Sequence, residues 1–304
     1  MVKTVLITGV AGFIAKHTVE ILNQSNFNII GIDRKPKPKD FVGRYYQMDV
    51  TSPLIENVFR ENTIDFVIHL SALPSVSESI KHPQQDCMDN YFATVNVCDY
   101  AKIYGVKKII FSSTAAVYAN PKYLPVDEKH LTDFISPYAI TKNASENFIK
   151  YCGIDYIIFR YANVYGEGQD CKGEAGVVAK FFDLMEHNEN IQIHGTGEQT
   201  RDFIYVKDIA KVNVLALENN VRNEIINVST NTSNSVNQLF EILQASLKYQ
   251  KQPIHTSSRA GDIKDSILDN SKLIKLFGYK PSIMLSEGIA LMTERVLVNG
   301  GRHE

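Results

Sequence analysis

Short apolar stretches alternate with helical patterns through the first half of the chain, and this alternation restricts the fold more than any other feature. Both faces of each stretch are apolar, which predicts buried strands in TVLIT, FNIIGID, IDFVIHLSA, VKKIIFSS and GIDYIIFRYAN. The helical patterns between them begin near Phe13, Pro53, Gln84 and Pro137. This order favours an α/β fold with a doubly wound parallel sheet between two layers of helices. Because ligands of such sheets bind beyond the carboxyl ends of the strands, we expect functional side chains there.

The pattern changes after about residue 165. A Gly-rich loop, GEGQDCKGEAG, precedes a helix, VVAKFFDLMEH, and a strand–turn–strand segment, IQIHGTGEQTRDFIYV, before DIAKVNVLALEN returns to helix. From Ser233 onward we expect short helices and loops without the strand–helix rhythm. We therefore predict two domains: residues 1–165 with 203–230 form the sheet domain, and residues 166–202 with 231–304 form a smaller, discontinuous α/β substrate-binding domain.

Charge and cysteine content exclude several classes of protein. The net charge of −2 provides no broad basic surface for nucleic acid or an anionic membrane. No apolar run approaches the roughly 20 residues of a membrane span, and the sequence opens on a strand pattern, VKTVLITG, instead of a signal segment. Neither a disulfide framework nor a metal site is expected from four widely spaced cysteines, Cys87, Cys98, Cys152 and Cys171. We expect a cytoplasmic protein.

A glycine turn in LITGVAGFIA joins the first strand to the first helix. Gly9, Gly12 and Ala15 occur in the order G-x-x-G-x-x-A. Glycines allow backbone N–H groups to approach a pyrophosphate, and the helix N-terminus supplies the positive end of a dipole. A bare match can be a mere tight turn, but Asp33 follows at the end of the second strand, where a carboxylate binds the ribose of a dinucleotide. The pattern predicts a Rossmann-type dinucleotide site.

Asp33 also indicates which dinucleotide binds. A carboxylate at this position repels a 2′-phosphate, so NAD is favoured over NADP. The neighbouring Arg34 and Lys35 weaken this preference, because either cation could pair with that phosphate.

The segment SPYAITK places Tyr138 four residues before Lys142, so both lie on one face of a helix. The unperturbed pKa of a tyrosine, about 10, makes it a poor base at neutral pH. We expect the lysine ammonium and an oxidised nicotinamide ring to lower that pKa. Thr114, after another strand, can orient a reacting alcohol. Alone, Y-x-x-x-K is usually a helix surface; with the glycine turn and Thr114 it predicts a catalytic set.

Ten motifs occur in a recognisable order over nearly the whole chain: TGVAGFIA, GID, MDV, HLSA, DNYFATVN, SSTAAVY, YAITK, RYANVYG, RDFIYV and RAGD. The sequence resembles the extended short-chain dehydrogenase/reductases of the nucleotide-sugar epimerase/dehydratase family. It departs from the family at Ala15, where glycine is usual, and at Ala162, where many members have phenylalanine. The resemblance implies bound NAD, a UDP-linked hexose as substrate and a homodimer.

The resemblance also implies a role for individual residues. Tyr138 is the base, Lys142 holds the nicotinamide ribose and tunes the tyrosine, and Thr114 is their hydroxyl partner. The implied cofactor contacts are Gly9, Gly12, Phe13, Ile14, Asp33, Arg34, Asp49, Val50, Leu70, Ser71, Ala72, Asn90, Ser112, Tyr138, Lys142 and Tyr161. The implied substrate contacts are Ser75, Thr114, Tyr138, Asn163, Val177, Arg201, Arg259, Asp262 and Ser266. Guanidinium groups suit the diphosphate, although Arg201 alone could be a surface partner of Asp202.

Two alanines bear on the reaction. Dehydrating members carry an Asp-Glu pair after the hydroxyl residue, because loss of water needs a separate acid and base. Ala115 and Ala116 occupy these positions, and an alanine can act as neither acid nor base. The interpretation that remains is 4-epimerisation through a transient 4-keto sugar. The alternatives are an NAD(P)H-dependent 4-keto-sugar reductase and, with less support, a dehydratase or a non-catalytic NAD-binding scaffold.

Ser266 aligns with a family position that is bulky in glucose-restricted epimerases and small in those that admit N-acetyl sugars. We therefore expect UDP-GlcNAc and UDP-GalNAc to be accepted alongside or instead of UDP-Glc and UDP-Gal, unless Ser266 is a loop serine without pocket contact. The helix that begins at Pro137 carries a second apolar stripe, suited either to the monomer core or to a dimer interface: Ile140, Ala144, Phe148 and Tyr151.

Overall fold

The computed structural model describes residues 2–171, 176–258 and 263–300, and the side chains of these residues up to 294. Two of the predicted substrate contacts, Arg259 and Asp262, lie outside the described residues.

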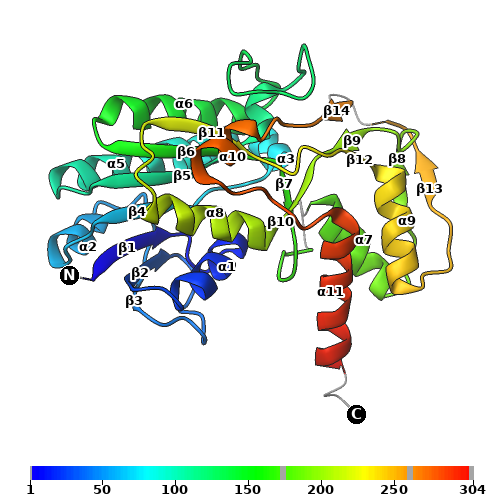
Figure 1. The fold of residues 1–304 in the computed structure, drawn as a ribbon, viewed down its shortest axis with the longest axis horizontal. Coiled ribbons are helices and arrows are strands. Elements are labelled where there is room, and N and C mark those ends of the chain that lie inside the picture. The colour runs from blue at the N-terminus through cyan, green and yellow to red at the C-terminus, as the bar shows by residue number, and fades with distance from the viewer. Residues whose placement is uncertain (1, 172–175, 259–262, 301–304) are drawn as a thin grey trace.

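Seven parallel strands form the central sheet, in the order β11–β6–β5–β4–β1–β2–β3 (Figure 1). The five strands expected from the sequence are confirmed as β1 (Lys3–Thr8), β2 (Phe27–Asp33), β4 (Phe66–His69), β5 (Lys108–Thr114) and β6 (Asp155–Tyr161). The two edge strands, β3 (Arg44–Gln47) and β11 (Glu224–Val228), were not predicted. The β3 sequence RYYQ is short and polar at both ends, and neither face is fully buried, so it lacks the apolar pattern of the inner strands.

Helices cover both faces of this sheet. On one face, α1 (Phe13–Leu22) and α8 (Val206–Glu218) pack together against a core that includes β1 and β6. The other face carries α2 (Ile55–Glu61), α5 (Ala93–Ile103) and α6 (Pro137–Cys152). The segment before α5 contains α3 (Val76–Lys81), α4 (Pro83–Asp86) and a π-helical turn, η1 (Cys87–Phe92), while η2 (Ala115–Tyr118) is a 3-10 turn after β5. The doubly wound α/β fold is therefore confirmed.

A smaller group of elements has its own apolar core beside the carboxyl end of the sheet (Figure 1). Its helices are α7 (Val177–Glu186), α9 (Val236–Leu247) and α11 (Leu285–Gly300). The prediction of short helices after Ser233 was wrong for α9 and α11, which have 12 and 16 residues. Helix α9 buries Leu239 and Leu243 and begins with a capping box between Ser235 and Gln238, so burial and capping both stabilise it.

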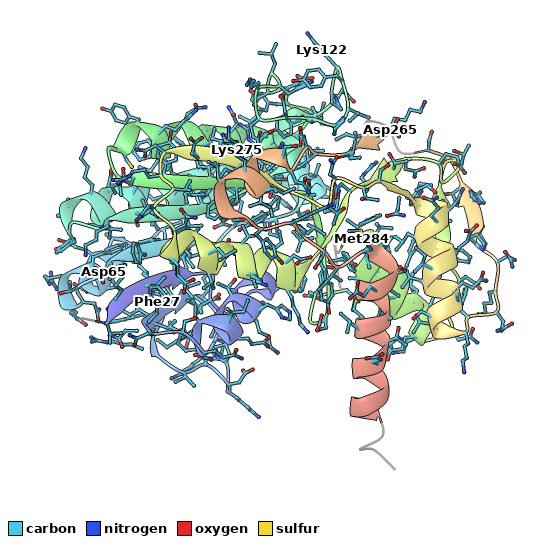
Figure 2. All side chains as sticks on the ribbon, in the orientation of Figure 1. Phe27, Asp65, Lys122, Asp265, Lys275 and Met284 are labelled. Carbon is cyan, nitrogen blue, oxygen red and sulfur yellow. The ribbon has the colours of Figure 1, made fainter. Side chains whose placement is uncertain are left out.

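Short strands connect distant segments within this smaller group. β9 (Thr200–Arg201) lies between β12 (Asn234–Ser235) and β14 (Asp265–Ser266), and Asp265 is labelled there in Figure 2. The remaining pairs are β7 (Asn163–Tyr165) with β10 (Phe203–Tyr205), and β8 (Gln192–His194) with β13 (Ile254–Thr256). Helix α10 (Ser271–Phe277) packs instead against β11 of the central sheet.

Hydrogen bonds to Asp202 join the segment after β9 to the segments that contain Thr230 and Leu268. Asp202 is fully buried, and its carboxylate accepts hydrogen bonds from the backbone and hydroxyl of Thr230 at 3.0 and 2.8 Å. Its other oxygen accepts the backbone N–H of Leu268 at 3.4 Å. Burial raises the pKa of Asp202 to about 6, although these hydrogen bonds act in the opposite direction.

Candidate active site

The glycine turn after β1 is compact because its residues approach neighbouring backbone closely. Gly9 has a φ of +70°, and its N–H donates to Ile32 O at 2.8 Å. A Cβ at Gly9 would lie 2.8 Å from backbone atoms of Ser71, and one at Gly12 would lie 2.9 Å from Gly9 O. Only glycine fits at Gly9, since both the space and the positive φ exclude a side chain. Phe13 then begins α1, so the first turn of this helix faces the same edge of the sheet.

Asp33 is held at the carboxyl end of β2 by two backbone donors. One carboxylate oxygen accepts the N–H of Ala11, in the glycine turn, and the other accepts the N–H of Lys35, both at 2.9 Å. These bonds orient the carboxylate beside the turn. A cavity of about 220 Å³ opens here, lined by Gly9, Gly12, Ile32, Asp33, Arg34, Lys35, Met48, Val50, Leu70, Ser71, Ala72, Leu73 and Asp89.

Most of the expected adenosine and pyrophosphate contacts therefore lie on one cavity. Asp49 adjoins it through Arg34, whose Nε lies 2.7 Å from Asp49 Oδ2. Sequence reasoning missed Asp89 as part of this wall, because no strand or glycine pattern precedes it. Phe13, Ile14, Asn90, Ser112 and Tyr161 are not among the residues that line this cavity.

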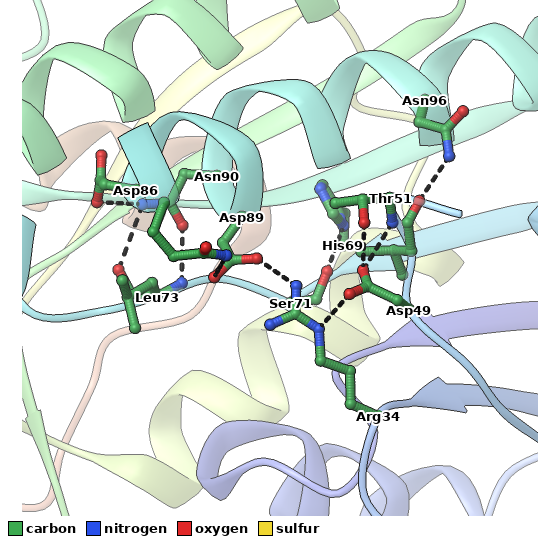
Figure 3. A network of polar contacts seen from close by, with 12 residues as sticks. Arg34, Asp49, Thr51, His69, Ser71, Leu73, Asp86, Asp89, Asn90 and Asn96 are labelled. Atoms are coloured by element: carbon green, nitrogen blue, oxygen red, sulfur yellow. Dashed lines mark hydrogen bonds and ion pairs between the residues drawn. The ribbon is translucent and has the colours of Figure 1, made fainter. Parts of the chain in front are cut away.

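Asn90 positions the cavity wall from behind. Its side-chain oxygen accepts the N–H of Leu73 at 2.8 Å, and its amide donates to Leu73 O at 3.3 Å and to Asp86 Oδ1 at 2.7 Å (Figure 3). The amide is thus used within the protein, and Asn90 supports the 71–73 loop from a buried position. Asp86 also accepts a hydrogen bond from the hydroxyl of Thr141 at 2.6 Å, which joins this network to α6.

The predicted catalytic residues come together at the carboxyl end of β5. Pro137 and a serine cap at Ser136 start α6, which brings Tyr138 and Lys142 to the sheet on the same buried face. Lys142 Nζ donates to Ser112 O at 2.6 Å. The hydroxyl of Thr114 caps η2 by accepting the N–H of Ala116 at 3.1 Å, and it lies close enough to the Tyr138 phenol to affect the pKa of that phenol.

Burial dominates the pKa of Tyr138 in the protein without its cofactor. Burial raises the pKa of Tyr138 to about 12, and the hydrogen bond from Thr114 only partly opposes this, while the negative charge of Asp86 adds to it. Burial also lowers the pKa of Lys142 to about 8. Without the cofactor, burial therefore keeps the Tyr138 phenol protonated at neutral pH. The lowering expected from the lysine together with an oxidised nicotinamide ring concerns the NAD complex and stays a prediction.

A buried ion pair lies behind the catalytic face of α6. Glu146, one turn after Lys142, accepts two hydrogen bonds from Arg160 of β6, at 2.9 and 2.6 Å. The hydroxyl of Ser113 donates to the same carboxylate at 2.5 Å. Arg160 also lies 4.8 Å from the centre of the Tyr118 ring. This network joins α6 to both strands beneath it, and the spacing of its members gave no signal in the sequence.

Three of the predicted substrate contacts meet through short strands. Asn163 donates its backbone and side-chain N–H groups to Asp202 O, at 2.9 and 3.2 Å, and so lies beside Arg201. Ser266 pairs with Arg201 across β14 and β9. Arg201 Nη1 donates to Thr200 O at 2.8 Å, and Asp202 turns inward, so the alternative of an Arg201–Asp202 surface pair has no support in this geometry.

The other predicted contacts have varied roles. Ser75 is the N-cap of α3, where its hydroxyl accepts Glu78 N–H at 3.0 Å, and Val177 is the first residue of α7. The phenol of Tyr161 donates to Asn213 of α8 at 2.6 Å within the core. That hydroxyl is therefore used within the protein, and the predicted cofactor contact of Tyr161 stays a prediction.

This geometry fits a dinucleotide. The cavity combines a close-packed glycine turn, the start of a helix and an oriented carboxylate, which suit a pyrophosphate and a ribose. Within residues 2–171, 176–258 and 263–300, no cluster of three or more His, Cys, Asp or Glu side chains is arranged to hold a metal ion. No helix in the described part of the chain is both long and apolar enough to span a membrane.

Comparison with known proteins agrees with this assignment. A putative UDP-glucose 4-epimerase of Methanocaldococcus jannaschii is 39% identical over 297 residues, covering 94% of this chain and 95% of the relative. A UDP-glucose 4-epimerase structure from Thermotoga maritima superposes with a TM-score of 0.94 at 36% identity, covering 97% and 99% of the two chains. A UDP-N-acetylglucosamine 4-epimerase structure from Methanobrevibacter ruminantium gives 0.91 at 32% identity, covering 98% and 99%. The model described as the NAD dependent epimerase/dehydratase family matches residues 5–229. The chain therefore belongs to this family of nucleotide-sugar enzymes, and its cofactor is NAD.

Proposed function

We propose that this protein is a UDP-hexose 4-epimerase that retains its NAD through each catalytic cycle. Tyr138 takes the proton of the sugar C4 hydroxyl. It later returns a proton to the C4 oxygen, after the 4-keto sugar has been reduced on its opposite face. Thr114 orients that hydroxyl, and Lys142 stabilises the phenolate. The bound NAD supplies reversible hydride chemistry, so no external redox partner takes part.

The observation that carries this proposal is the convergence of Thr114, Tyr138 and Lys142 at the carboxyl edge of β5, next to two alanines. Ala115 and Ala116 begin η2 directly after Thr114 and offer no acid or base for elimination of water. The named relatives support the same reaction, since two of them are UDP-glucose and UDP-N-acetylglucosamine 4-epimerases.

A direct test is to incubate the purified protein, without added NAD, separately with UDP-Glc, UDP-GlcNAc and UDP-GlcA, and to separate the C4 epimers. We expect epimer formation to equilibrium, with no net NADH. Tyr138→Phe should reduce turnover by about 10²–10⁴-fold while the protein retains its NAD. Stoichiometric consumption of NADPH without epimer formation would instead identify a 4-keto-sugar reductase.

For the sugar, we propose that 2-acetamido substrates are accepted. Ser266 pairs with Arg201 at the edge of the substrate region, and a serine there leaves more room than a bulky residue. Ser266→Tyr should selectively suppress turnover of UDP-GlcNAc, with turnover of UDP-Glc as the internal control. An equal loss on both sugars would contradict this role.

We also propose that α6 forms part of a homodimer interface. Ile140 and Tyr151, on the outer face of this helix, are 52% and 82% exposed, and Phe92 of η1 is 42% exposed nearby in the fold. Apolar residues on the outer side of α6 and η1 are suited to a second copy of the same helices. Light scattering should give twice the chain mass of 34.2 kDa, and Tyr151→Lys should favour the monomer.

A further inference from the structure

Arg34 forms a bridge across the ribose end of the NAD cavity. It follows Asp33 at the end of β2 and pairs with two carboxylates, Asp49 after β3 and Asp89 in η1 (Figure 3). Its Nε lies 2.7 Å from Asp49 Oδ2, and its Nη2 hydrogen-bonds to Asp89 Oδ1. We call these three residues the Arg34 bridge.

The bridge differs from an ordinary surface ion pair. The side chain of Asp89 is only 9% exposed, and its second oxygen accepts the side-chain amide of Gln85 at 3.0 Å. Asp89 is therefore held by Gln85 and by burial as well as by Arg34. The hydrogen bond to Asp89, and to a smaller extent that to Asp49, raises the pKa of Arg34, so the guanidinium stays charged and paired.

The bridge also lies where a dinucleotide carries its distinguishing group. Asp33, Arg34, Lys35 and Asp89 all line the cavity, and Asp33 is the carboxylate placed to meet the ribose hydroxyls. NAD presents a neutral 2′-hydroxyl at this point, whereas NADP presents a dianionic phosphate.

We propose that Asp89 is a specificity-determining residue that excludes NADP by keeping Arg34 paired. A 2′-phosphate could use the Arg34 fork only if both charge-assisted hydrogen bonds were broken, which would leave the nearly buried Asp89 without its cation. The same phosphate would meet three carboxylates, Asp33, Asp49 and Asp89. NAD meets no such penalty, so Arg34, a residue type that often recognises a 2′-phosphate, is here unavailable to that phosphate because it is paired with carboxylates.

This inference concerns the cofactor and does not depend on which sugar is turned over. The experiment uses the protein as purified, with its bound NAD. The holoprotein is challenged with increasing NADP at constant ionic strength, and the NAD displaced is quantified after filtration, which gives the ratio of NADP to NAD affinity. Direct titration of any cofactor-free fraction by calorimetry provides a second readout.

Asp89→Asn keeps the side-chain shape and releases Arg34 from its buried acid. We expect the NADP-to-NAD affinity ratio to rise by roughly tenfold or more, equivalent to about 1.4 kcal/mol. The conservative Asp89→Glu should retain the wild-type ratio. The matched charge control is Asp40→Asn, since Asp40 is an exposed acid of the nearby 34–43 loop that faces Lys16 at 4.0 Å and does not line the cavity; it should change the ratio less than threefold.

The double variant Asp89→Asn/Arg34→Gln separates a freed arginine from a general loss of negative charge. If Arg34 binds the phosphate once it is released, the gain in NADP affinity disappears in the double variant. An Asp89→Asn ratio equal to that of Asp40→Asn, or a gain that survives removal of Arg34, overturns the proposal. If Asp89→Asn does not fold, Asp89→Ser removes the same carboxylate and carries the same expected outcomes.

Discussion

Replacing Glu146 by glutamine should destabilise the protein more than any comparable surface substitution. Glu146 and Arg160 are 1% and 5% exposed, and two hydrogen bonds of 2.9 and 2.6 Å join them. Glu146→Gln keeps the shape of the side chain but leaves the arginine charge buried without an anion. Loss of one partner of such a pair costs about 3–5 kcal/mol, which corresponds to a fall in Tm of roughly 6–20 °C.

Urea and thermal unfolding followed by circular dichroism would measure this loss. The matched control is Glu61→Gln, because Glu61 pairs with Arg44 on the surface, where the side chains are 45% and 53% exposed. It should cost less than about 1 kcal/mol. The variant Arg160→Met and the double variant Glu146→Gln/Arg160→Met complete a double-mutant cycle. The double variant should lose less unfolding free energy than the two single variants lose in sum. If Glu146→Gln is no worse than Glu61→Gln, the argument from burial is refuted.

Two further predictions concern buried acids. Asp86→Asn should move the whole pH–activity profile to lower pH, because the negative charge of Asp86 raises the pKa of both Tyr138 and Lys142. Measurement of kcat across pH, with Asp40→Asn as the control variant, checks this prediction. A shift of the profile to higher pH would contradict it. Asp202→Asn should flatten the pH dependence of stability: the folded pKa of Asp202, about 6, lies above its ordinary 3.8, so its contribution is fully present below pH 3.8 and is lost as pH rises through 6. Unfolding free energies at pH 4, 5, 6 and 7 would show a fall of about 2.4 kcal/mol from this group in the wild type, and an equally steep fall in the variant would show that Asp202 is not its source.

The predictable parts of the fold are those determined by residues close together in the sequence. A run such as TVLIT, apolar on both faces, is typical of a strand inside a covered sheet, and the turn at Gly9 and Gly12 follows it directly. The same holds for α6, where Ser136, Pro137 and the Tyr138–Lys142 spacing mark the start and one face of a helix. These features depend on neighbours within a few residues.

The features that escaped prediction depend on residues distant in sequence. Asp89 meets Arg34 across 55 positions, and Arg160 meets Glu146 only because β6 lies beneath α6. The raised pKa of Tyr138 likewise follows from burial, which the Tyr–Lys spacing does not report. Edge strand β3 was missed because a partly exposed strand has no continuous apolar run.

The three-stranded arrangement of β12, β9 and β14 has a consequence for the order in which the molecule matures during synthesis. The glycine turn, Asp33 and the Tyr138–Lys142 pair all lie within the first 142 residues, whereas Arg201 gains its neighbour Ser266 only after 65 more residues have been translated. A nascent chain on the ribosome thus acquires the elements for its dinucleotide well before it completes the proposed sugar site. NAD binding could then precede folding of the C-terminal segments, and a chain truncated before β14 should still bind NAD while lacking one part of the proposed sugar site.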